Sequence, residues 1–448
     1  MHIIVVGAGE VGYHVADRLA SQQHDVVIVD VDADRLEYVA SHLDVAVVEG
    51  SGTSTAVLEQ AGVHRAGLLL AVTNMDEVNL VSCMSAREVR GLTKVARVSN
   101  PDFYRDTRNL KPEAFGVDVL INPERELALE TMRLLQSTAA TDIAVFAGGA
   151  VQLLGYVVPD GAPVAGHTLR ELAERYGDRP ILTVAIVRDG ETIVPTGATE
   201  VRAGDQLYVA AKSEDVGASL DLLGYAPAVV RRVIITGGST EAYYLSQLLQ
   251  QHRVQTTLLI ADRQRAQELA EELNSVLVLH GDATDVELLE LEGVGGADAF
   301  IALTDGDETN ILSSLVAKRA GARQVITLVN KRDYMPLARH IGLDAAVSPR
   351  LSAANAILRY VRRGTVTRVA TFAGSDAEAI AFEVTERSPL AGKALAEVDF
   401  PDGAIVAAIV HGQGVVVPRG GDRVSAGDTC IVFALPRAVQ AVTEFFPS

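Results

Sequence analysis

The 448-residue sequence contains the same pattern twice. Val233–Gly238 repeats, 230 residues later, the apolar run and glycine turn that begin at Ile3. Ala302–Asn310 repeats Ala71–Asn79, with five of nine positions identical. Because both copies carry these parts in the same order, the chain is predicted to be a tandem duplication of one unit.

The first thirty residues have the pattern of a dinucleotide-binding unit. Ile3–Val6 is a β-branched run that predicts a buried strand, and the glycine turn Gly7–Gly12 follows it directly. Apolar residues then recur at helical spacing before a second strand that ends at Asp30. Strand, glycine turn, helix, strand and acid form the dinucleotide-binding fingerprint. The alternative is a purely structural glycine turn in an α/β domain.

Each part of the fingerprint has a physical reason. Gly7 permits a tight turn, Gly9 lets a pyrophosphate approach the backbone, and Gly12 lets the helix pack close to the strand. The free N–H groups at the start of the helix then face the phosphates. The carboxylate of Asp30 accepts hydrogen bonds from a ribose diol and repels a 2′-phosphate, which favours NAD or an adenine nucleotide over NADP.

Strands and helices alternate through the rest of the first 122 residues. This alternation predicts a parallel sheet covered on both faces, with a ligand at the carboxyl ends of its strands. The predicted fold class is therefore α/β, with two Rossmann-like parallel-sheet domains that are each followed by a small α+β domain. In the first small domain we expect short strands and one helix, at Thr168–Tyr176.

The duplication divides the chain into six predicted parts. Each copy has a Rossmann-like domain, a crossover helix that begins at an Asn-Pro or Ser-Pro pair, and a small domain. The parts are residues 1–122, 123–142 and 143–226 in the first copy, and 227–348, 349–368 and 369–448 in the second. The crossover helices are predicted to pack on another subunit or on the next domain.

The composition limits the partners and the compartment. The net charge is −19, which disfavours nucleic acid and anionic lipid surfaces as general partners. With only Cys83 and Cys430, neither a disulfide framework nor a cysteine zinc site is expected. Met1-His2 leads directly into a strand, and no apolar run approaches the roughly 18–20 residues of a membrane-spanning helix. We therefore expect a soluble, cytoplasmic protein.

The duplicated unit and its motifs resemble a known protein family. Its two units are similar to RCK domains (regulator of potassium conductance), and their tandem arrangement resembles the TrkA family of Trk potassium-uptake regulatory subunits. The resemblance covers essentially the full chain. It is carried by the following motifs: Gly7–Gly12, Val72–Asn79, His280–Asp285, Leu303–Asn310, and the Ala-Gly-Asp turns at Ala203–Asp205 and Ala426–Asp428.

The resemblance implies a regulatory protein that is not an enzyme. Such subunits assemble as a homo-oligomer (a dimer or a tetramer ring) beneath a membrane potassium-translocating subunit of the TrkH or TrkG type. They are cytoplasmic and peripheral at the inner face of the cell membrane, and they gate ion flow when NAD(H), ATP or ADP binds. The family's nucleotide contacts fall on these positions: Gly7, Ala8, Gly9, Glu10, Val11, Gly12, Asp30, Ser51, Gly52, Thr73, Asn74 and Arg97. Arg97 has an alternative role as a solvated surface residue.

The second copy departs from the family pattern at its glycine turn. Ser239 and Ala242 stand where Gly9 and Gly12 stand in the first copy. The residues available there are Gly237, Gly238, Asp262, Thr304 and Asp305.

The acid of the second copy is also displaced. Counting back from Gly281 as from Gly50 places Ala261 opposite Asp30, and Asp262 follows as a possible substitute. We expect a pseudo-site that keeps the architecture without binding a dinucleotide.

The main alternative function is an NAD-dependent oxidoreductase. It requires an acid or base placed against a carbonyl or alcohol, usually on a dedicated substrate domain. The ten histidines are scattered, and the small domains are duplicated with the units, whereas a substrate domain is expected once. The acidic pairs Asp76-Glu77 and Asp307-Glu308 are predicted to cap helices, with cation binding as the alternative.

Overall fold

The computed structural model describes the chain except for residues 22–23, 101–102, 104–111, 138–139, 177–180, 226–228, 332–333, 359–364, 373–374, 413 and 448. The chain forms two compact units, each made of two segments. The first unit comprises Met1–Glu126 and Pro349–Arg363, and the second comprises Leu127–Ser348 and Gly364–Ser448.

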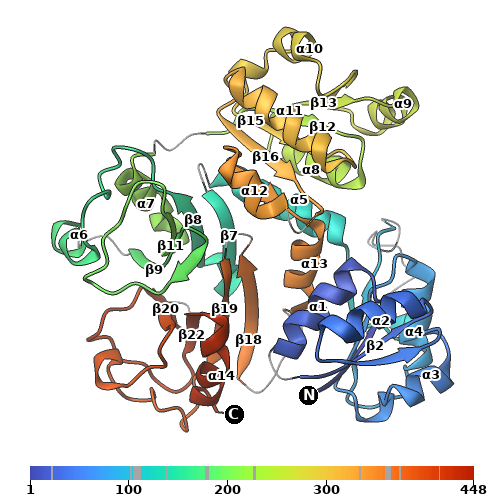
Figure 1. Cartoon of the computed structure of the whole chain (residues 1–448), viewed down its shortest axis with the longest axis vertical. Helices are drawn as coiled ribbons and strands as arrows, with labels where there is room; N and C mark the ends of the chain where they lie inside the picture. The colour runs from blue at the N-terminus through green and yellow to red at the C-terminus, as the bar shows by residue number, and fades with distance from the viewer. Residues whose placement is uncertain are drawn as a thin grey trace. The chain divides into compact units, whose positions relative to one another are not determined.

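The first unit is built on a six-stranded parallel sheet, in blue and cyan in Figure 1. Its order is β3-β2-β1-β4-β5-β6. Strands β2 and β3 are added on one side of β1 and β4 to β6 on the other, so the strand order reverses between β1 and β4. The strands are β1 (His2–Val6), β2 (Asp25–Asp30), β3 (Ala46–Glu49), β4 (Leu68–Ala71), β5 (Thr93–Arg97) and β6 (Val119–Ile121). In a sheet of this kind, ligands bind beyond the carboxyl ends of the strands at the reversal.

Helices connect these strands. They are α1 (Glu10–Ser21), α2 (Ala33–His42), α3 (Thr55–Gln60) and α4 (Asp76–Ser85), with 3₁₀ turns at Val63–Arg65 and Pro112–Phe115. The four residues of β4 are all buried, as expected for a central strand covered on both faces. One face of the sheet packs on a core that includes Leu58, Leu80 and Cys83 from the helices.

Each crossover helix packs on the unit that contains the other copy's Rossmann sheet. Helix α5 (Pro123–Gln136) contributes Leu127 and Leu134 to the same core as Val233 of the second sheet. Helix α13 (Pro349–Leu358) packs against α1 in the first unit, as Figure 1 shows. Both crossover helices thus pack on parts of the chain outside their own Rossmann-like domain.

The second unit contains the repeated parallel sheet, whose order is β14-β13-β12-β15-β16-β17. The strands are β12 (Arg232–Thr236), β13 (Gln255–Ile260), β14 (Val276–His280), β15 (Ala299–Ala302), β16 (Gln324–Leu328) and β17 (Ala345–Val347). The helices are α8 (Thr240–Gln251), α9 (Arg263–Glu272), α10 (Val286–Leu291), α11 (Asp307–Arg319) and α12 (Tyr334–His340), with a 3₁₀ turn at Val294–Gly296.

Two five-stranded antiparallel sheets complete the second unit. Their orders are β10-β9-β11-β8-β7 and β18-β19-β22-β20-β21. The first comprises β7 (Ala140–Phe146), β8 (Val151–Val157), β9 (Ile181–Arg188), β10 (Glu191–Ile193) and β11 (Gln206–Lys212). The second comprises β18 (Val366–Phe372), β19 (Ser375–Glu383), β20 (Ala404–His411), β21 (Gly414–Val416) and β22 (Thr429–Ala434).

The two small domains share one core. Their helices are α6 (Leu169–Tyr176), α7 (Val216–Leu223) and α14 (Pro436–Phe445), with 3₁₀ turns at Ala147–Gly149, Ser213–Asp215 and Leu395–Glu397. The buried rings of Tyr208 and Phe372, one from each copy, meet edge to face with centroids 4.9 Å apart. The aromatic residues are few, and several of them are used here, where the copies join.

The predicted fold class and the tandem duplication are confirmed. The first small domain differs from prediction in one respect, because it has a second helix, α7, besides the predicted α6. The predicted boundary between residues 226 and 227 lies outside the described residues, and the predicted end of the second crossover segment, residue 368, falls within β18. Among the residues described, no helix combines the length and the apolar character needed to cross a bilayer.

Candidate functional site

The glycine turn after β1 is shaped by contacts that exclude side chains. Gly7 has a φ of +112°, and its N–H donates to the carbonyl oxygen of Val29 at 2.8 Å. A Cβ added at Gly12 would lie 1.9 Å from the carbonyl oxygen of Gly7. These two glycines are therefore required by the turn and by the close packing of α1.

Gly9 is different, because the protein itself leaves room at that position. A Cβ added there would meet only the Nη1 atom of Arg35, at 3.6 Å. Packing within the described chain does not require a glycine at this position. A backbone that must stay open to a ligand does require one, so the turn fits the pyrophosphate of a dinucleotide.

Asp30 lies directly against this turn. It is the last residue of β2, and its Oδ2 accepts a hydrogen bond from the Ala8 N–H at 2.5 Å. Its Oδ1 accepts from the Asp32 N–H at 3.0 Å. The carboxylate is thus held beside the glycine turn, which is the position from which it can accept hydrogen bonds from a ribose.

The turn after β3 contributes one structural and one polar residue. Gly52 is buried, and an added Cβ would lie 2.2 Å from Cγ1 of Val6. The Ser51 hydroxyl is half-buried and lies 2.8 Å from Oγ1 of Thr53. Ser51 therefore supplies a hydroxyl that could contact a ligand, whereas the missing side chain of Gly52 lets this turn pack against β1.

The loop after β4 is organised by a residue that sequence reasoning missed. Asn79 is fully buried, and its Oδ1 accepts from both the N–H and the hydroxyl of Thr73, each at 2.8 Å. Its Nδ2 donates to the carbonyl oxygens of Thr73 at 3.0 Å and Arg97 at 2.9 Å. Asn79 thus joins the ends of β4 and β5, and Asn74 is exposed on the loop that it holds.

The identity of Asn79 and Asn310 in the two copies was the signal that could have identified this role. Asn310 makes the same hydrogen bonds to Thr304 and to the carbonyl oxygen of Leu328. Because the asparagine makes the same hydrogen bonds in both copies, its role is to hold the loop structure that the two Rossmann-like domains share.

The acidic pairs at the starts of α4 and α11 were predicted to cap those helices. Instead, the Asp76 carboxylate accepts from the N–H groups of Ser99, at 3.0 Å, and Asn100, at 2.8 Å, in the loop after β5. Asp307 accepts from Asn330 and Lys331 in the same way. The cap prediction was wrong for these two aspartates because their side chains point to the neighbouring strand's loop.

Arg97 ends β5 and forms an ion pair with a crossover helix residue. Its Nη2 lies 3.3 Å from Oε1 of Glu124, and its side chain is 22% exposed. Nε of Arg97 is buried and has no hydrogen-bond partner among the described residues. Arg97 is therefore not a solvated surface arginine, and a phosphate group would compete with Glu124 for it.

The candidate residues come from the ends of five adjacent parallel strands. The turn after β1 contacts Asp30 and lies against Thr73, and Asn79 links Thr73 to Arg97. The sequence-predicted residues are thus brought to one edge of the first sheet. No cluster of three or more His, Cys, Asp or Glu side chains suited to a metal occurs in the described part of the chain.

The corresponding edge of the second sheet is altered. The Ser239 hydroxyl caps α8 by accepting from the Ala242 N–H at 3.2 Å. Arg265 donates from Nε to the carbonyl oxygen of Gly238 at 2.9 Å, so its side chain lies against the turn. The Ser239 side chain stands where the first copy has Gly9, whereas Arg265 corresponds to Arg35, whose Nη1 also lies near the first turn.

The register corrects the predicted position of the missing acid. Gly237 N–H donates to Leu259 O, as Gly7 N–H donates to Val29 O, so Ile260 stands opposite Asp30 and the prediction of Ala261 was wrong. One extra residue before Gly281 caused the error. Asp262 caps α9 by accepting from the Arg265 N–H at 2.6 Å, which is the role of Asp32 in the first copy.

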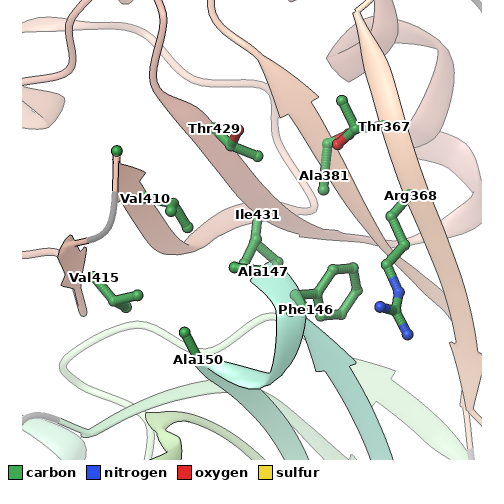
Figure 2. Close-up of a pocket in the computed structure, with 12 residues that line it drawn as sticks. Phe146, Ala147, Ala150, Thr367, Arg368, Ala381, Val410, Val415, Thr429 and Ile431 are labelled. Carbon is green, nitrogen blue, oxygen red and sulfur yellow. The ribbon is translucent and has the colours of Figure 1, made fainter.

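A concave region lies between the two small domains (Figure 2). It is a cavity of about 570 Å³ whose lining includes Phe146 from the first copy and Val410 and Ile431 from the second. The Arg368 guanidinium lies 5.2 Å from the centre of the Phe146 ring, beside the cavity. Sequence reasoning missed this cavity because its two walls come from segments more than 200 residues apart.

Comparison with known proteins gives the chain's family. The TrkA-N domain matches residues 3–123 and 233–349, and the TrkA-C domain matches residues 153–224 and 379–446. The chain belongs to the TrkA family. It is 37% identical over 446 residues to the Trk system potassium uptake protein TrkA homolog of Archaeoglobus fulgidus, with 100% of both chains covered. It is 35% identical over 451 residues to TrkA of Azorhizobium caulinodans, covering 100% of this chain and 98% of that one.

Solved structures show the same fold for this TrkA-family chain. The crystal structure of the GsuK RCK domain matches with a TM-score of 0.59 at 20% identity, over 99% of this chain and 94% of that one. The GsuK channel bound to NAD matches with a TM-score of 0.59 at 20% identity, over 99% and 78%. The likeness extends to nearly the whole chain, so both copies have the RCK fold.

Proposed function

We propose that this chain is a nucleotide-sensing regulatory subunit of a Trk-type potassium uptake system, and that NAD(H), ATP or ADP binds in the first cleft. The open position at Gly9, with Asp30 beside it, carries the proposal. Backbone N–H groups at the start of α1 serve phosphates, and Asp30 serves the ribose diol. A matching structure, the GsuK channel, is described as bound to NAD.

The proposed partner is a membrane potassium-translocating subunit of the TrkH or TrkG type, with several copies of this chain assembled at the inner face of the membrane. Relatives named as Trk system potassium uptake proteins support this assignment. Bound nucleotides would act by stabilising one arrangement of the assembly over another. A ligand shifts such an equilibrium only by its differential affinity for the two states, so the nucleotides must differ in their contacts, most directly at the phosphate end near Arg97.

The second cleft is proposed to be a pseudo-site. Ile260 replaces the acid, and Ser239 places a side chain where the first copy has Gly9. Calorimetric titration should therefore give about one nucleotide per chain.

The experiment compares wild type with Asp30→Ala by calorimetric titration with NADH, ATP and ADP. Asp30→Ala should weaken binding about tenfold or more, because the ribose hydroxyls lose a charged acceptor. Asp262→Ala is the matched control and should leave affinity unchanged. The proposal is wrong if no nucleotide binds or if Asp30→Ala leaves every affinity unchanged. Oxidation of NADH with a panel of carbonyl substrates would support the oxidoreductase instead.

A further inference from the structure

The start of α13 brings an arginine from the second copy of the sequence to the glycine turn of the first. Arg350 is the second residue of α13, and its Nε lies 2.7 Å from Oε2 of Glu10. Glu10 is the first residue of α1 and follows Gly9 directly. Both residues belong to the first unit, in which α13 packs on α1. The Arg350 side chain is 20% exposed, and that of Glu10 is 67% exposed.

Glu10 places a negative charge at the start of α1, where the phosphates of the proposed nucleotide would also lie. The N-terminus of α1 favours an anion, and the Glu10 carboxylate is the anion that the chain itself supplies at this helix end. A phosphate that binds the same N–H groups approaches this carboxylate and is repelled by it. Arg350 is the cation that contacts Glu10, so it is placed to compensate for that repulsion.

The ion pair between Glu10 and Arg350 has no equivalent at the corresponding positions of the other copy. Arg350 corresponds to Glu124 in the first crossover helix, since Pro349-Arg350 repeats Pro123-Glu124. Glu10 corresponds to Thr240. The charge at each of the two positions therefore differs between the copies, and only the cleft with the complete fingerprint receives the arginine.

A purely structural role explains the pair poorly. Helix α13 is already held by apolar packing, because Ala353, Ala354 and Ile357 are buried. An ion pair with one exposed partner contributes little to the free energy of unfolding. Moreover, the Glu10 side chain is 67% exposed, so solvent screens its attraction to the guanidinium.

We infer that Arg350 is a phosphate-binding residue of the first cleft and exchanges Glu10 for the phosphates of a bound nucleotide. This inference rests on the proposed function of that cleft. A guanidinium suits the task because its planar set of N–H donors matches phosphate oxygens in pairs. The expected ligands are nucleotides with two or more phosphate groups. An arginine from the second copy would then change its partner when a nucleotide binds in the first copy.

The test is calorimetric titration of the full chain with ATP, ADP and adenosine. Arg350→Gln should weaken ATP and ADP binding about tenfold or more and leave adenosine unchanged, because only the phosphates lose a charged partner. Arg350→Lys should recover part of the loss. Glu10→Gln should strengthen ATP binding. Arg125→Gln, an exposed arginine at the start of α5, is the matched control and should bind as wild type does.

The double variant Glu10→Gln with Arg350→Gln separates direct contact from simple neutralisation of Glu10. With direct contact, the double variant binds ATP at least about fivefold more weakly than Glu10→Gln alone. Equal affinities of these two proteins would overturn the inference, as would an Arg350→Gln variant that binds ATP normally or loses adenosine equally. If wild type binds none of the nucleotides, the proposed function fails and this inference fails with it.

Discussion

At the scale of single residues, the glycines of the turn have two different reasons to be glycine. Gly12 is fixed by the fold, because its added Cβ would lie 1.9 Å from a backbone oxygen. Gly9 has space for a methyl group. Gly12→Ala should therefore lower the free energy of unfolding by about 3 kcal/mol or more, as expected for a clash with the backbone. Gly9→Ala should leave it unchanged within about 0.5 kcal/mol and weaken nucleotide binding.

Urea unfolding of both variants measures the first effect, and calorimetric titration of Gly9→Ala measures the second. A Gly9→Ala protein that is stable and binds NADH as wild type does would show that the open space has no relation to a ligand. A Gly12→Ala protein of normal stability would show that α1 can move away from the strand at little cost.

The two cysteines give a second prediction at this scale. Burial raises the pKa of the Cys83 thiol and of the Cys430 thiol to about 12 in each case. At pH 8 only about one thiol in ten thousand is then ionised, and the thiolate is the reactive form. A chromogenic disulfide reagent should therefore modify neither residue in the folded protein and both after denaturation. Rapid modification of one thiol without denaturant would show that its part of the core opens readily.

At the scale of elements, the start of α4 depends on Asn79. This side chain makes four hydrogen bonds that join the ends of β4 and β5, and all of its partners are backbone groups or the Thr73 hydroxyl. Asn79→Ala should lower the free energy of unfolding by about 2–4 kcal/mol, because it leaves these buried groups unpaired.

Asn310→Ala is the matched variant in the second copy and should be similarly destabilising. Only Asn79→Ala should also weaken nucleotide binding, since Thr73 and Arg97 lie in the complete cleft. Chemical denaturation and calorimetry of both variants test this difference. Equal loss of nucleotide binding in both would show that the effect comes from general instability.

The elements also show how far sequence reasoning reaches. The parallel strands were predictable because each is a short apolar run that ends in a turn residue, and Asp30 and the glycine turn were found from their spacing. Helix α7 was missed because its sequence, Val216–Leu223, is mostly apolar and contains Gly217, so it lacks a clear polar face. The bonds of Asp76 and the ion pair of Arg350 join segments far apart in sequence, and no local pattern encodes such contacts.

At the scale of the whole molecule, duplication has left one complete cleft and one altered cleft, and it has kept the same apolar surface position in both copies. Val81 on α4 is 42% exposed, and Leu312 on α11, its counterpart 231 residues later, is 53% exposed. Met84, one turn after Val81, is also 42% exposed. Apolar side chains grouped on one exposed helix face are typical of a surface that another protein covers.

We expect α4 to take part in the proposed assembly of several copies of this chain. Val81→Glu with Met84→Glu should then lower the assembled mass, because two charges would have to be buried against an apolar neighbour. Size-exclusion chromatography with light scattering measures the mass. Leu291→Glu is the matched control, since Leu291 is an apolar residue at the end of a different helix, α10, and is 84% exposed. A mass unchanged by the α4 variant, or lowered equally by Leu291→Glu, would place the contact elsewhere.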